Sequence, residues 1–211
     1  AACSRIGSFS LEGCEIHTTG EPCPMCLGAI HWARIRQIHY GFRVEDAAAL
    51  TRTLYRCYGW SYPNHTMYYP ERIAAAIESG ERIGEVAVTE SGEIAAHWGA
   101  IYLSPGVVET GGTVTDPRFR RRGLANQLGE RLLVRLNELK VVGRVREPVI
   151  THTATQEIAL REGATMVGVY LGYTHPMQQV GITDGMQESR NSLSVAYGNL
   201  QPLTPATMWI P

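Results

Sequence analysis

The 211-residue sequence has no apolar run close to the roughly 18 residues that a membrane-spanning helix needs. Its first residues contain no apolar segment of signal-peptide length, and its five cysteines follow no disulfide-framework spacing. The net charge of -1 gives no basic excess that would make nucleic acid the default partner. These absences favour a cytoplasmic protein with reduced thiols, without membrane contact and without nucleic-acid binding.

Hydrophobic residues make up 44% of the chain, enough for one sizeable core, or for one core and a small appendage. Apolar periodicity and turn residues predict an α/β (α+β) fold. Strands are predicted within 11–19 and over 37–43, 84–89, 93–103, 107–115, 145–151, 165–173 and 191–197. Helices are predicted from Pro24, from Glu45, over 69–80, along a leucine stripe from Leu124 to Leu139, and over about 154–162.

The stretch from 111 to 132 carries the strongest chemical signal in the larger part of the chain. A strand ends at Asp116-Pro117, a basic turn follows, and Gly123 begins a helix. Backbone N–H groups at a helix start lack partners and favour an anion, and glycine lets a phosphate approach them. The turn therefore fits a pyrophosphate cradle, although a solvated basic turn remains an alternative. It is not a GxxxxGK[ST] loop, which disfavours nucleotide hydrolysis.

Arg120-x-x-Gly123-x-Ala125 resembles the [QR]-x-x-G-x-[GA] acetyl-CoA motif of the GNAT superfamily of N-acetyltransferases. The order of predicted elements over about residues 36–200 is similar too. The resemblance implies a central mixed, mostly antiparallel sheet flanked by helices, with two strands splayed to admit the thioester. It also implies a set of residues that bind acetyl-CoA. Thr113, Val114 and Thr115 would hydrogen-bond the pantetheine arm, and Arg120, Arg121, Arg122, Gly123, Leu124, Ala125 and Asn126 would surround the pyrophosphate.

Acetyl transfer needs a base for the amine and a donor for the oxyanion, and the leaving thiolate takes a proton from an acid or from water. Many relatives place a tyrosine acid four residues before the glycine that ends the later helix. That position is Ala159 here, so another donor is needed, or the domain binds acetyl-CoA without turnover. Glu109 and His152 are the candidate bases, with a structural role as the alternative for each. We interpret His97 as a packed core histidine. The aromatic loop 58–64 is interpreted either as part of the core or as the lining of an acceptor pocket.

Cys23 and Cys26 lie at the predicted start of the first helix, where the dipole favours thiolates that bind Zn²⁺. The surrounding residues 1–42 resemble zinc-dependent nucleobase deaminases, especially bacterial guanine deaminases and tRNA adenosine deaminases. In that family a third ligand and the proton-shuttling glutamate come from an H-x-E motif, which this sequence does not contain. His17 and His31 are weak substitutes. Zinc is therefore possible, but its site is incomplete.

The two resemblances overlap at residues 36–50. We expect Ile38–Phe42 to join the larger sheet, which leaves residues 1–35 as a hairpin-and-helix appendage and 36–211 as the GNAT-like domain. An appendage with an open sheet edge would dock, dimerise or stay mobile. Because the chain does not begin with Met, it is interpreted as a possible fragment of a longer protein.

The sequence thus predicts an acetyl-CoA-dependent N-acetyltransferase acting on a small-molecule or protein amine, joined to an incomplete, inactive deaminase segment. One alternative is a nucleobase or tRNA deaminase completed by sequence outside this chain. A second is a non-catalytic acetyl-CoA-binding regulatory module. The expected partners beyond the acceptor are a second copy of the chain or the missing deaminase half.

Overall fold

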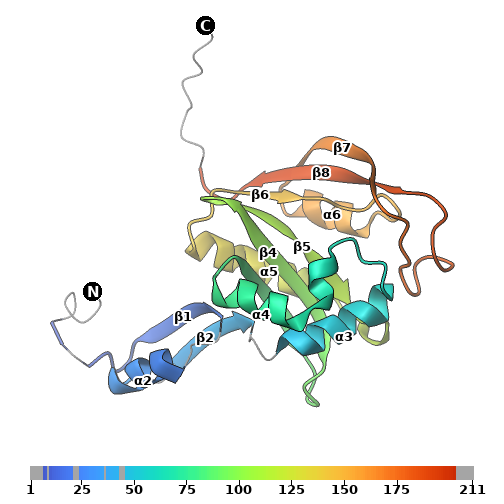
Figure 1. The fold of residues 1–211 in the computed structure, drawn as a ribbon. Helices are drawn as coiled ribbons and strands as arrows, with labels where there is room; N and C mark the ends of the chain where they lie inside the picture. The colour runs from blue at the N-terminus through green and yellow to red at the C-terminus, as the bar shows by residue number, and fades with distance from the viewer. Residues whose placement is uncertain (1–6, 9, 21–23, 36, 43–45, 203–211) are drawn as a thin grey trace, which may run out of the picture.

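The computed structural model describes residues 7–8, 10–20, 24–35, 37–42 and 46–202. Figure 1 shows a small β-α-β unit at the N-terminal end, set beside a larger body built on one sheet with helices on both faces. The candidate site lies in the larger body.

The N-terminal unit consists of β1 (Glu15–Gly20), α2 (Pro24–Trp32) and β2 (Gln37–Phe42). The two strands pair in parallel as a separate two-stranded sheet. The predicted membership of Ile38–Phe42 in the larger sheet is therefore wrong, whereas the predicted hairpin falls partly outside the described residues. The physical reason is that α2 supplies the crossover connection that parallel strands require, so β2 pairs with the strand that precedes it in the chain. The division at residues 35 and 36 stays a prediction.

The larger sheet has six strands in the order β3-β4-β5-β6-β8-β7. Every neighbouring pair is antiparallel except β5 and β6, which confirms the predicted mixed, mostly antiparallel sheet. The strands are β3 (Arg82–Val88), β4 (Ile94–Ser104), β5 (Val107–Thr115), β6 (Gly143–Arg146), β7 (Thr165–Thr174) and β8 (Asn191–Asn199). The predicted strand 145–151 ends early at Arg146 because Pro148 has no N–H to continue the ladder.

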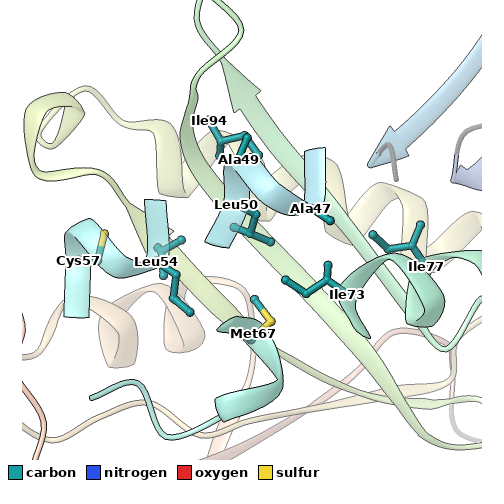
Figure 2. Close-up of a cluster of buried hydrophobic side chains, with 10 residues drawn as sticks. Ala47, Ala49, Leu50, Leu54, Cys57, Met67, Ile73, Ile77 and Ile94 are labelled. Carbon is teal, nitrogen blue, oxygen red and sulfur yellow. The ribbon is translucent and has the colours of Figure 1, made fainter. Parts of the chain in front are cut away.

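Helices cover both faces of this sheet and bury two apolar clusters. On one face lie α3 (Asp46–Tyr58), the short 3₁₀ helix η1 (His65–Tyr68) and α4 (Pro70–Glu78), which form the cluster drawn in Figure 2. On the other face α5 (Leu124–Glu138) packs its leucine stripe against Trp98 and Val108. The last helix, α6 (Ala154–Arg161), buries Ala159 against β8 on the same side as α5. No helix in the described ranges is long and apolar enough to cross a membrane.

Candidate active site

The two parallel strands at the centre of the sheet separate partway along their length. β5 and β6 pair only from Val107↔Gly143 to Glu109↔Val145, with the hydroxyl of Thr110 donating to the Val145 carbonyl at 3.4 Å. From there β5 continues to Thr115 with ladder pairing to β4, while β6 ends at Arg146. The edge of β5 beyond Glu109 therefore has no ladder partner on the β6 side among the described residues. An extended ligand can align along such an edge.

A β-bulge marks the point where the strands part. His97 pairs with Val114 and Gly99 pairs with Gly111, so β5 carries one extra residue between them. Gly112 occupies this bulge at a φ of 64°, a left-handed conformation that glycine adopts without strain. The bulge also reverses which face each side chain takes. Val108 packs towards α5, whereas Val114 packs towards α3. Glu109 lies on the α3 face by simple alternation with Val108.

His97 supports the bulge from within the sheet. Its Nδ1 lies 2.8 Å from the Gly112 carbonyl, so this nitrogen carries the proton and donates it. The ring is fully buried, and burial lowers the pKa of His97 to about 4, which keeps the imidazole neutral. A Cβ at Gly84 or Gly99 would come within 2.9 Å of the ring. The interpretation of His97 as a core histidine is consistent with this position.

The turn after β5 leads into a helix start without a side-chain cap. Gly123 is the N-cap of α5 with a φ of 74°, and Arg121 also has a positive φ of 62°. Gly123 is exposed, and the nearest atom to a Cβ built there is the side-chain nitrogen of Gln127, at 3.6 Å. The first amides of α5 thus begin at an accessible surface, with the positive end of the helix dipole behind them.

The three arginines before Gly123 have different surroundings. The Arg120 guanidinium turns back into the protein, where Nε donates to the Thr115 carbonyl at 3.2 Å and Nη1 donates to the Val180 carbonyl. Arg121 and Arg122 are exposed, and Arg122 lies over the Phe119 ring. Arg120 therefore fastens the loop before β8 to the end of β5, while Arg121 and Arg122 place positive charge at the surface near the helix start.

The residues expected to meet the pantetheine arm lie on the last part of β5. Val114 is buried in the α3-side cluster, whereas Thr113 and Thr115 are partly exposed. The Thr115 carbonyl already accepts from Arg120 and from the Cys57 thiol, the latter at 3.3 Å. The backbone groups of β5 that a ligand could hydrogen-bond are therefore those between the bulge at Gly112 and Thr115.

A small open pocket, which encloses about 60 Å³, adjoins the bulge on the α3 face. It is lined by Tyr62, Asn64, Met67, Arg82, Gly99, Ile101, Glu109, Gly111 and Gly112. Burial raises the pKa of Tyr62 to about 12, so its phenol stays protonated at neutral pH. The pocket therefore combines a carboxylate, a guanidinium and a phenol, with Met67 and Ile101 as its apolar side chains.

The two candidate bases lie in different environments. Glu109 lines the pocket. Burial raises the pKa of Glu147, just beyond β6, and the Glu109 carboxylate raises it further. His152 lies in the loop before α6 and is not among the pocket residues. Its Nδ1 is buried without a hydrogen-bond partner in the described part of the chain, and burial with the nearby Arg120 lowers its pKa. The structure brings Glu109, but not His152, to the pocket.

The sequence analysis did not identify two charged residues at this site, Arg82 and Glu147. Arg82 begins β3 and is buried, which its apolar neighbours Ile83 and Val86 could have indicated. Glu147 interacts electrostatically with Glu109 because β5 and β6 are neighbouring strands, and no spacing in the sequence reveals that pairing. Tyr62 was noted only as part of the aromatic loop. At Ala159 the side chain is fully buried, so that position offers no acid.

The cysteine pair is described only in part. Cys23 lies outside the described residues, while Cys26 is exposed on α2. His31 is exposed near the end of the same helix. In the described ranges, no three His, Cys, Asp or Glu side chains gather into a group that could hold a metal ion. The residues that the structure describes therefore do not by themselves form a zinc site.

Comparison with known proteins separates the two parts of the chain. Residues 1–42 match the family described as the cytidine and deoxycytidylate deaminase zinc-binding region. Guanine deaminase from Bacillus subtilis is 49% identical over 47 residues, which is 22% of this chain and 30% of that enzyme. The chain thus spans less than a third of this curated relative. The N-terminal resemblance to zinc nucleobase deaminases is confirmed.

The remainder matches solved N-acetyltransferases in fold. The ribosomal-protein-S18-alanine N-acetyltransferase from Escherichia coli superposes with a TM-score of 0.59 at 16% identity, covering 79% of this chain and 94% of that one. A GNAT superfamily phosphinothricin acetyltransferase from Sinorhizobium meliloti, solved with acetyl-CoA, gives 0.59 at 14% identity, covering 74% and 84%. The larger part of the chain therefore has the GNAT fold, as the sequence predicted.

Proposed function

We propose that this chain transfers an acetyl group from acetyl-CoA to the nitrogen of an amine. The observation that carries the proposal is the open edge of β5 beyond Glu109, which leads from the pocket at the bulge towards the helix start at Gly123. Such an edge supplies main-chain partners for an extended pantetheine arm, and an uncapped helix start supplies donors for a pyrophosphate. A solved protein of the same fold holds acetyl-CoA.

The side chains of the pocket divide the chemistry among them. The amine nitrogen attacks the thioester carbonyl, a C–N bond forms, the C–S bond breaks, and the products are the acetylamide and the thiol. The carboxylates of Glu109 and Glu147 accept the proton that the amine loses. The phenol of Tyr62, which is protonated at neutral pH, returns a proton to the leaving thiolate in place of the absent tyrosine at position 159. The direct test is release of thiol from acetyl-CoA on addition of a panel of amines.

Glu109→Gln should lower kcat about a hundredfold, the usual scale for removing a general base. The acid limb of the remaining activity should also move to lower pH. Without the negative charge of Glu109, the raised pKa of Glu147 falls towards its ordinary value, and the carboxylate stays ionised to lower pH. A pH series of kcat measures both effects. Glu157→Gln, an exposed change on α6, is the control, and an unmoved acid limb in Glu109→Gln would contradict the pairing of the two carboxylates.

For the N-terminal segment we propose that this chain does not deaminate nucleobases. The observation behind this is the absence of an H-x-E motif from the sequence, which leaves neither the expected third ligand nor the proton shuttle. We expect the purified chain to hold far less than one zinc ion and to release no ammonia from guanine. Elemental analysis and an ammonia assay check this. One zinc per chain together with ammonia release would favour the deaminase as the working activity.

A further inference from the structure

Arg82 is a buried cation whose guanidinium has no bonded partner in the described part of the chain. The residue is only 6% exposed, yet its guanidinium makes no hydrogen bond and no ion pair within 4 Å to any described residue. Every other buried arginine in the larger body, Arg144 and Arg146, is paired with Glu162. A desolvated guanidinium without such a partner costs free energy, so its retention points to a ligand that completes it.

The position of Arg82 directs this cation into the pocket. Arg82 pairs with Ile101 across β3 and β4, and both line the pocket beside Glu109. Ile83, the next residue, packs on the opposite face towards α5, so the strand alternation aims Arg82 at the α3 face. Burial lowers the pKa of Arg82, while Tyr62 and Glu109 oppose that change. The guanidinium therefore interacts electrostatically with the Glu109 carboxylate without a hydrogen bond between them.

The pocket consequently holds two charges of opposite sign that do not neutralise each other by direct contact. A guanidinium binds a carboxylate through parallel N–H donors, and a carboxylate holds an ammonium or amine. The pocket encloses only about 60 Å³ and is open at its mouth, so it fits the charged end of a small molecule. Its apolar surface comes from Met67 and Ile101.

We propose that the acetyl acceptor is a small α-amino acid, with its carboxylate on Arg82 and its amine towards Glu109. This inference rests on the proposed acetyl transfer and names the substrate class for the same pocket. An amine without a carboxylate leaves Arg82 desolvated and unmatched, so the pocket discriminates against it. A protein lysine, which carries no carboxylate beside its amine, is disfavoured for the same reason.

The test compares amino acids with the matching amines that lack the carboxylate. Calorimetry measures their binding, and thiol release from acetyl-CoA measures their turnover. Arg82→Met keeps the length of the side chain and removes the charge, so amino-acid binding should weaken at least tenfold, whereas the carboxylate-free amines should be unaffected. Arg82→Lys should recover part of the loss. Arg52→Met, an exposed change on α3, is the matched control, and circular dichroism melting checks that each variant is folded.

The outcomes separate this inference from the proposed transfer. If amines without a carboxylate bind and react as well as amino acids, the acetyl transfer stands and the amino-acid assignment is overturned. If amino acids bind in an Arg82-dependent way but no thiol is released, the subsite stands and the transferase proposal fails. Equal amino-acid affinity in the wild type and in Arg82→Met would overturn the assignment directly.

Discussion

Gly123→Asp should weaken acetyl-CoA binding by about a hundredfold or more. The substitution places a side chain and a negative charge at the N-cap of α5, where the first amides of the helix face the surface. An aspartate there accepts hydrogen bonds from those amides and repels the pyrophosphate from them. Calorimetry with acetyl-CoA on the wild type and on the variant measures the loss.

Two further variants separate charge from backbone strain. Gly123→Ala keeps the site neutral but forces a residue with a Cβ to a φ of 74°, so it reports the conformational cost alone. Val134→Asp puts the same charge on an exposed position of α5 far along the helix and should leave binding unchanged. Equal acetyl-CoA affinity in wild type and Gly123→Asp would refute the placement of the pyrophosphate at this turn.

Glu162→Ala should destabilise the fold by about 3–5 kcal/mol, the range for breaking a buried ion pair by removing one partner. The Glu162 carboxylate accepts from Arg144 and from Arg146, the latter at 2.8 Å, and both arginines are buried. Arg146 also lies over the Trp98 ring, with 4.5 Å from its guanidinium carbon to the ring centroid. Removing the carboxylate leaves two buried cations beside each other.

Urea denaturation measures this loss as a change in the free energy of unfolding. Glu157→Ala, an exposed change one helix turn earlier on α6, should shift stability by no more than about 0.5 kcal/mol. Because Glu162 lies on the α5 side of the sheet, away from the pocket, a folded Glu162→Ala variant should still bind acetyl-CoA. A stability equal to that of the wild type would show that the two arginines find water or another acceptor.

The local elements of the fold could be predicted from the sequence because their signals lie within a few residues. The leucine stripe indicated α5. Pro70 and Gly80 lie at the two ends of α4, and the turns 91–92 and 105–106 separate the three strands β3, β4 and β5. The Gly123 turn was also legible, since a glycine after a basic turn and before an apolar stripe is a local helix-start signal. The predicted strand 145–151 was too long at its C-terminal end because Pro148, which cannot donate to a ladder, lies within an otherwise apolar run.

The pairing of β2 could not be read in the same way. Ile38–Phe42 suits either sheet by composition, and only the folded segment shows that β1, joined through α2, is its partner. Likewise the sequence places Arg120, the first position of the motif, with Arg121 and Arg122 among the residues around the pyrophosphate. The Arg120 side chain points into the protein because the Val180 carbonyl, sixty residues away in the sequence, lies near the end of β5 and accepts its hydrogen bond.

The sequence by itself determined the kinds of element, their order and the glycine turn before α5, because periodicity, capping and turn chemistry act over one helix turn or one hairpin. Only the tertiary structure decided which charges meet in the pocket. Arg82 and Glu109 line the pocket from β3 and β5, and Glu147 interacts electrostatically with Glu109 from the chain after β6. They converge because strand order, a one-residue bulge and the parting of two strands bring distant segments to one face of the sheet.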